Sequence, residues 1–158
     1  MIAEAALAAA LVAGVGVAAA PPLDAPAKVK PCKDRVVKWI HEAGFTGVNV
    51  RVAWAVAQRE SNGNPREATP PDLGLMQLNA VWQGTKYWPA NVFDPVNNLT
   101  AVRKMVRDMG WQPWGLRVRG GQVTYDFSAY GGWSSWHHQN WIVIPFERYW
   151  RQFPKECR

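Results

Sequence analysis

The chain has 158 residues, which is enough for one domain with its own hydrophobic core, and no internal repeat indicates a second domain. Its composition, 48% apolar and 19% charged, is that of an ordinary globular protein. The formal net charge of +6 comes from positive residues scattered singly along the chain, without a dense basic cluster or a recognisable nucleic-acid-binding motif. We therefore predict no nucleic-acid partner.

Residues 1–31 differ in composition from the rest of the chain. An uninterrupted apolar run covers residues 5–20, and a stretch rich in Pro, Ala and Lys follows it. The run is shorter than the roughly twenty residues of a membrane span and fits the core of a signal peptide, with small residues at Ala18 and Ala20 before a cleavage point. Residues 1–4 lack the positive charge of a normal export signal, so an uncleaved segment that touches the membrane transiently through residues 5–20 is the alternative. We predict that residues 1–31 are this segment and a linker.

The folded domain is predicted to be residues 32–158, and the two cysteines lie at its edges. A bridge between Cys32 and Cys157 would tie the two ends of the domain together. In the chain-entropy model a loop of that size stabilises the fold by about 4 to 5 kcal/mol. Such a bridge needs an oxidising compartment, and two unpaired thiols are the alternative.

Two helices are predicted before the first long loop. Residues 34–43 form an amphipathic pattern that has Asp34 near its start and stops at Gly44. From Val50 to Ala57 only one residue is charged, and a helix that is apolar nearly all round belongs in a core. The Ser-Asn-Gly-Asn-Pro sequence of residues 61–65 ends this second helix.

Glu60 lies near the end of the second helix, on one stripe with Ala53, Val56 and Ala57. The small alanine side chains leave open space beside it. Partial burial disfavours an ionised carboxylate in general, so an acid in such a position can keep a proton for donation. A solvated residue at the helix end is the alternative.

A proline-rich loop follows the second helix. Residues 63–72 contain three prolines, which we expect to prevent regular structure. The loop carries Asp72 back toward Glu60. Whether Asp72 faces the same space as Glu60 is left open by the sequence.

The clearest helix pattern in the chain begins at Asp94-Pro95, an N-cap followed by a favoured first residue, and ends at Gly110. We expect it to be scaffold, with its basic residues Arg103, Lys104 and Arg107 facing solvent. Residues 116–125 alternate around a Gly-Gly pair, which predicts a small hairpin.

The segment 133–158 is aromatic and gives no clear element. The adjacent pair His137-His138 suggests a metal at first sight. However, neighbouring side chains rarely point at one ion, and no Cys or carboxylate at ligand spacing accompanies the pair. We therefore predict no metal site.

Three motifs resemble those of the lysozyme-like lytic transglycosylases: Glu60-Ser61, Asn64-Pro65, and the Gly-Leu-Met-Gln-Leu-Asn sequence of residues 74–79. The stretch from Asp72 to Trp82 also resembles a segment of animal-type lysozymes and of the small transglycosylases attached to export machines. The resemblance covers about residues 45–114. It implies a mainly helical α+β architecture, a lysozyme-like fold with a small hairpin.

The same resemblance implies the site residues. Glu60 corresponds to the catalytic acid, and Asp72 to the second carboxylate of animal lysozymes. The saccharide groove would be lined by residues able to hydrogen-bond or stack on sugars, namely Ser61, Gln77, Asn79, Trp82 and Tyr130. A capping or turn role is the alternative for Gln77 and Asn79. The family usually has Asn after the tyrosine, where this chain has Gly131.

The predicted reaction is cleavage of the β-1,4 bond between N-acetylmuramic acid and N-acetylglucosamine in peptidoglycan glycan strands, with Glu60 as general acid and base. We favour a lytic transglycosylase. A hydrolytic lysozyme using Glu60 and Asp72 is the first alternative, and a non-catalytic cell-wall-binding or virion structural module is the second. The reaction needs no metal or organic cofactor. We expect the protein outside the cytoplasm, secreted or periplasmic, or associated with a virion.

Overall fold

The computed structural model describes residues 32–132 and 134–158. The signal-peptide-like segment predicted at residues 5–20, and with it the predicted membrane contact, lies outside the described residues. Within the described ranges, no helix has the length and apolar character needed to cross a membrane.

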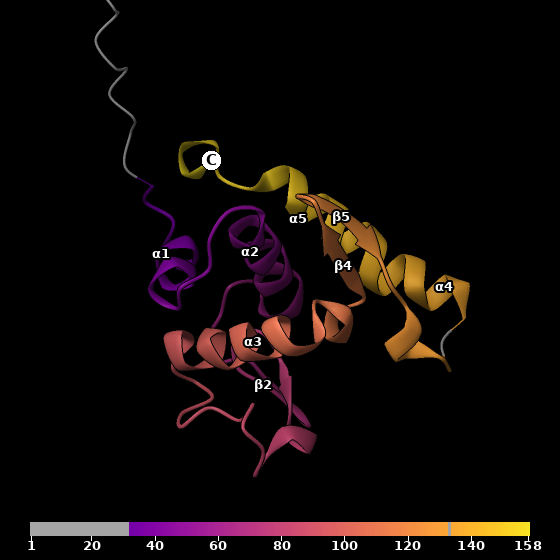
Figure 1. The fold of residues 1–158 in the computed structure, drawn as a ribbon, viewed down its shortest axis with the longest axis horizontal. Helices are drawn as coiled ribbons and strands as arrows, with labels where there is room; N and C mark the ends of the chain where they lie inside the picture. Colours follow the sequence, from indigo (N-terminus) through magenta and orange to yellow (C-terminus); the bar gives the residue numbers. More distant parts are fainter. Residues whose placement is uncertain (1–31, 133) are drawn as a thin grey trace, which may run out of the picture.

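Helix α2, Val48–Ser61, runs through the middle of the molecule and is buried along most of its length. Helix α1, Arg35–Glu42, packs on one side of it, and the C-terminal helix α5, Ile144–Gln152, packs on the other (Figure 1). The sequence placed Asp34 near the start of α1, and the structure shows it as the N-cap, whose side chain accepts a hydrogen bond from the Val37 backbone N–H. The apolar character of α2 therefore makes it the centre of the core.

A small antiparallel sheet follows α2. Its strands are β1 (Ala68–Thr69), β2 (Asp72–Leu73) and β3 (Leu78–Asn79), and the short 3-10 helix η1 (Ala80–Trp82) follows directly. The prediction that residues 63–72 are loop throughout was therefore wrong at its end. The adjacent prolines Pro70 and Pro71 fall in the turn between β1 and β2, where no ladder hydrogen bond is required of them.

Helix α3, Pro95–Met109, lies below α2 in Figure 1 and packs against α1. It begins at the predicted N-cap, Asp94, which accepts from the Asn97 N–H, and it ends at Gly110. Its basic residues Arg103, Lys104 and Arg107 are exposed, as expected. The helix is scaffold for the sheet.

The predicted hairpin is present. Strands β4 (Leu116–Arg119) and β5 (Gln122–Tyr125) pair antiparallel, and the turn residues Gly120 and Gly121 both have positive φ. The 3-10 helices η2 (Gln112–Trp114) and η3 (Ser128–Tyr130) flank the hairpin.

The C-terminal segment is helical, which the sequence pattern did not predict. Helix α4 (Ser135–His137), the π-helix η4 (His138–Val143) and helix α5 (Ile144–Gln152) continue one another, and the 3-10 helix η5 (Lys155–Cys157) ends the chain. Cys157 forms the predicted disulfide with Cys32, with the two Cα atoms 4.7 Å apart. The protein is thus mainly helical α+β, as predicted.

Candidate active site

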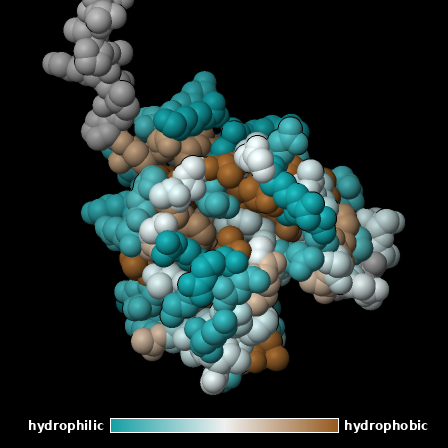
Figure 2. Space-filling view, in the orientation of Figure 1, coloured by the Kyte–Doolittle hydropathy of each residue, from teal (hydrophilic) through white to brown (hydrophobic). Residues whose placement is uncertain are grey.

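A cavity of about 350 Å³ opens where the end of α2 meets the sheet, η2 and the C-terminal helices. In Figure 2 the surface is hollowed at lower right, between the part that holds β2 and the part that holds α4. Its walls come from residues far apart in sequence, namely Arg59, Glu60, Asp72, Gln77, Leu78, Asn79, Trp82, Met105, Pro113, Trp114, Tyr130, Trp141 and Ile142. Six of the seven predicted site residues are among them.

Glu60 lies in the last turn of α2, just before the chain reverses at Asn62, which has a left-handed backbone. Its side chain is 26% exposed and faces the cavity. Oxygen Oε1 accepts two hydrogen bonds from Arg59, at 2.9 Å from Nε and 2.5 Å from Nη2. Within residues 32–132 and 134–158, no hydrogen bond falls on Oε2, so this oxygen is left for a ligand.

Sequence reasoning missed Arg59. Adjacent helical residues normally point in different directions, so nothing in the pattern suggested that Arg59 would contact Glu60. The Arg59 side chain is only 6% exposed, and its Nη1 also donates to the carbonyl oxygen of Trp114 at 3.1 Å. A buried guanidinium therefore fixes the position of the cavity carboxylate and links α2 to η2.

Ser61 is the one predicted site residue that does not line the cavity. It is buried, and its hydroxyl donates to the carbonyl oxygens of Ala57 (2.9 Å) and Leu75 (2.7 Å). The structure places it behind the wall, where it joins the end of α2 to the segment that follows β2.

Side chains of α3 and η2 also hold residues 74–76 in place through hydrogen bonds to their backbone. The buried amide of Asn98 accepts from the Met76 N–H and donates to the Val92 carbonyl oxygen, while the Trp114 indole donates to the Met76 carbonyl oxygen. At Gly74, which has φ +78°, a Cβ would lie 2.3 Å from the Val92 oxygen, so only glycine fits. Residues 74–76 of the motif therefore serve mainly to position the residue that follows them.

That residue is Gln77, which has a positive φ and lines the cavity. Its side-chain NH₂ donates to the carbonyl oxygens of Gly74 (2.8 Å) and Glu67 (3.3 Å). The turn-stabilising role that we considered for Gln77 is thus present, and within the described residues no hydrogen bond falls on its amide oxygen.

Asp72 and Asn79 are paired across β2 and β3, and both line the cavity. The Asn79 side-chain NH₂ donates to Asp72 Oδ1 at 2.8 Å, and Asn79 Oδ1 accepts from the Val81 N–H at the start of η1. The question left open by the sequence is answered: Asp72 faces the same cavity as Glu60. Trp82 forms the end of this wall and packs edge-on against Tyr87.

Tyr130 closes the opposite side. Its hydroxyl donates to the Pro113 carbonyl oxygen at 2.6 Å. Burial raises the pKa of Tyr130, and the negative charges of Glu60 and Asp72 raise it further, against the opposing effect of Arg59. The tyrosine therefore stays neutral and lies in the field of both carboxylates.

The cavity also has a wall that the sequence did not predict, formed by Trp114, Trp141 and Ile142. The first is in η2 and the other two are in η4. The described part of the chain, the cavity included, holds no group of three or more His, Cys, Asp or Glu side chains placed to hold a metal ion.

The sequence model of a family described as a lysozyme-like domain matches residues 37–116, just over half of the chain. The chain belongs to this family, which confirms the resemblance seen in the motifs around Glu60. No curated protein and no solved structure matches the chain. The matched range includes Glu60, Asp72 and Trp82, and it ends before Tyr130 and the C-terminal helices.

Proposed function

We propose that this protein is a lytic transglycosylase that cleaves the β-1,4 bond between N-acetylmuramic acid and N-acetylglucosamine in peptidoglycan. The observation that carries the proposal is the cavity itself. It brings the partly buried carboxylate of Glu60 together with a second carboxylate, two amides, an indole and a phenol, in a chain of the lysozyme-like family. This is the set of groups that recognition and cleavage of a polar polysaccharide require.

Glu60 supplies the acid. Oxygen Oε1 is engaged by Arg59, so the proton for the bridging oxygen is carried on Oε2. As the glycosidic bond breaks, that proton moves to the leaving sugar oxygen. The resulting carboxylate then takes the proton from the 6-hydroxyl of the muramic acid, whose oxygen closes onto C1 and leaves an anhydro-sugar end.

Asp72 and the polar wall support this step. Positive charge develops at C1 in the transition state, and the Asp72 carboxylate, which lines the same cavity as Glu60, stabilises it. The amide oxygen of Gln77 and the second N–H of the Asn79 amide remain for hydroxyl and N-acetyl groups of a sugar. The Trp82 ring offers an apolar face to a sugar.

Hydrolysis is the second candidate, because Asp72 lines the same cavity as Glu60. In a retaining hydrolase the second carboxylate attacks C1 and water releases the product, which ends in a reducing sugar. Both reactions use Glu60 in the same way and differ in the nucleophile.

Digestion of purified peptidoglycan, followed by mass spectrometry of the soluble fragments, tests the proposal. We expect anhydromuramic acid ends and no gain of reducing ends. Fragments that carry only new reducing ends would show that the protein is the hydrolase and not the transglycosylase. Binding to the wall without release of any soluble fragment would overturn both and leave a non-catalytic wall-binding module.

The substrate and the disulfide both support a location outside the cytoplasm. Peptidoglycan lies there, and a bridge such as Cys32–Cys157 persists in oxidising compartments. The predicted signal-like segment at residues 5–20 agrees with this proposal. Fractionation of cells that produce the full chain tests it, and retention in the cytoplasmic fraction would contradict it.

A further inference from the structure

The C-terminal wall of the cavity is formed by two neighbouring residues of η4 that lie in different environments. Ile142 is 3% exposed, whereas Trp141 is 62% exposed, yet both line the cavity. They lie beyond residue 116, where the family match ends. This wall is therefore a feature of the chain that the shared family region does not contain.

Ile142 attaches the wall to the site. It packs against Gly115, where a Cβ would lie 2.9 Å from Ile142 Cδ1 and 3.5 Å from the Tyr130 ring. Gly115 has φ +73°, so the backbone also favours glycine there. The missing side chain lets η4 approach η2 and Tyr130 closely, which fixes the residue before Ile142 at the mouth of the cavity.

The helical register at this point is unusual. Residues 138–143 form a π-helical turn between two α-helical segments. Such turns are rare, and they occur frequently at functional sites because the extra residue per turn redirects a side chain. Here the turn carries the buried Ile142 and the exposed Trp141 side by side.

An exposed indole at the mouth of a sugar-sized cavity has a clear chemical use. Pyranose rings present flat C–H faces that pack on aromatic rings, and the indole N–H can donate to a hydroxyl. Trp82, on the sheet wall, already packs edge-on against Tyr87. Trp141, on the opposite wall, keeps most of its surface free for a ligand that continues out of the cavity.

We propose that Trp141 is a sugar-stacking residue that extends the cleft and makes the protein prefer long glycan strands over short fragments. The proposal rests on the proposed function, since it concerns the same cavity and the same polymer. It names the specificity that the C-terminal helices add to the family's site: a strand must be long enough to pass the cavity and reach the indole.

The test measures binding in the Glu60→Gln background, so that no cleavage occurs during the measurement. Isothermal titration with short and long oligomers of N-acetylglucosamine gives the affinity for each length. We expect Trp141→Ala to weaken binding of the long oligomers about tenfold, as loss of about 1.4 kcal/mol from one stacked ring would do, and to leave the short oligomers unaffected. Trp141→Tyr keeps an aromatic face and should restore most of the affinity.

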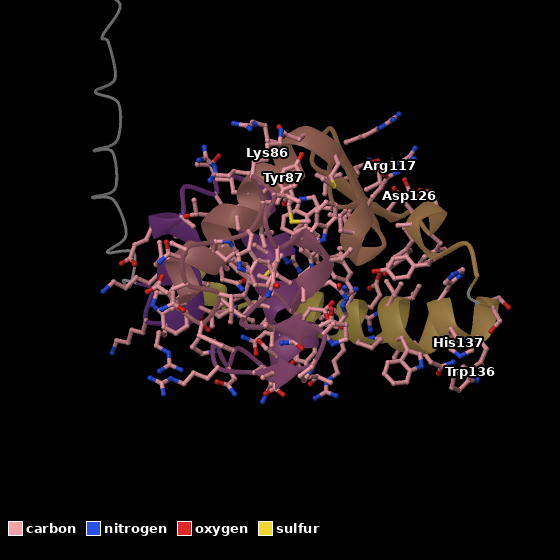
Figure 3. The ribbon with its side chains drawn as sticks, turned by 90° about the horizontal axis from the view of Figure 1, so that it is seen from below. Lys86, Tyr87, Arg117, Asp126, Trp136 and His137 are labelled. Atoms are coloured by element: carbon pink, nitrogen blue, oxygen red, sulfur yellow. A yellow bond between two sulfur atoms is a disulfide. The ribbon has the colours of Figure 1, made fainter. Side chains whose placement is uncertain are left out.

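Trp136 provides the matched control. It is also 62% exposed and belongs to the same run of helices, but it does not line the cavity. Figure 3 shows it at the far end of the helical run, next to His137. Trp136→Ala should bind every oligomer like the parent protein. Both tryptophans are mostly exposed, so neither truncation opens a core cavity, and thermal unfolding checks that the fold is intact.

Equal losses from Trp141→Ala and Trp136→Ala would overturn the proposal, because they would indicate general adhesion of exposed indoles. A loss that is the same for short and long oligomers would also overturn it. The failure of the proposed function is distinguishable: wild-type protein would then release no wall fragments, while the length-dependent effect of Trp141→Ala on binding would still be measured.

Discussion

Among the carboxylates that are paired with an arginine in the described part of the chain, Glu60 and Asp126 form pairs that are built in opposite ways. In the cavity the arginine is the buried partner: the Arg59 side chain is 6% exposed and that of Glu60 is 26% exposed. At the base of the hairpin the acid is the buried partner: the Asp126 side chain is 7% exposed and that of Arg117 is 46% exposed. The first pair presents its acid to a cavity, and the second presents its cation to solvent (Figure 3 labels the second pair).

The hydrogen bonds show the same contrast. Glu60 is bonded through Oε1 only. Both oxygens of Asp126 are bonded: Oδ1 accepts from the Ser128 N–H and hydroxyl, and Oδ2 accepts from Gln112 and Arg117. These bonds, those from Ser128 first, hold the pKa of Asp126 well below its usual range. An arginine partner alone therefore does not identify a functional acid. Glu60 differs from Asp126 in keeping one oxygen without a hydrogen bond within the described residues, and this is the feature on which its proposed role rests.

The largest expected effect is that of Glu60→Gln. The substitution keeps the shape of the side chain but removes the ability to give and take a proton. We expect the rate of fragment release from peptidoglycan to fall by about 10² to 10⁴-fold, with a thermal unfolding midpoint close to that of wild type. A variant that keeps a substantial fraction of the wild-type rate would remove Glu60 from the mechanism and make the two acids functionally alike.

Removal of Arg59 should affect both stability and activity. Arg59→Met leaves the Glu60 carboxylate and the Trp114 carbonyl oxygen without their donors in a half-buried site. We expect the free energy of unfolding to fall by about 1 to 3 kcal/mol and the initial rate to fall as Glu60 loses its fixed position. Urea unfolding and initial rates on peptidoglycan measure the two effects. Arg59→Lys keeps the positive charge but loses the two-pronged contact with Glu60. Its stability and its initial rate should lie between those of the wild type and of Arg59→Met. Unchanged activity in Arg59→Met would show that Glu60 needs no positioning.

The scaffold was readable from sequence because its signals are local. The N-cap Asp94 and the terminating Gly110 set the ends of α3, and the Gly-Gly pair set the hairpin turn. Such signals act within a few residues of chain, so one sequence contains them in full. The polar residues of the cavity were predicted from motifs, because a family motif marks the sequence positions at which members of the family carry functional residues.

The rest depended on contacts between distant segments. Ser61 belongs to a recognisable motif, but only the fold shows that its hydroxyl turns inward to Leu75. The orientation of Arg59 is set by a carbonyl group in η2, far along the chain. The C-terminal helices with Trp141 have no family match and carry an aromatic composition without clear periodicity, so nothing in the sequence pointed toward the cavity.

Asp126→Asn tests the other half of the comparison. The substitution removes the charge that Arg117 and the Ser128 and Gln112 donors satisfy, at the junction of the hairpin and η3. We expect the thermal midpoint to drop while fragment release continues at close to the wild-type rate below that midpoint. Asp108→Asn is the control, since Asp108 is also paired with an arginine, Arg107, and with Lys86, but both cations are mostly exposed, and pairs with exposed cations stabilise little. If Asp126→Asn abolished activity without loss of stability, the hairpin acid would belong to the catalytic machinery.

The smallest expected effect is a difference in acid sensitivity. The folded-state pKa of Asp126 is depressed relative to about 3.9 for an unfolded aspartate. Its contribution to stability is therefore fully present above about pH 4 and is lost as the pH falls toward the folded-state value, because the unfolded chain takes up the proton first. The pKa of Asp108 is depressed in the same direction, chiefly by its bond from Arg107, so the comparison is best made in the Asp108→Asn background. In that background, urea unfolding at a series of pH values from neutral to below pH 4 should show a shallower acid loss for Asp126→Asn. Parallel curves for the two proteins would mean that the bonds to Asp126 stabilise its charged form no more than water does.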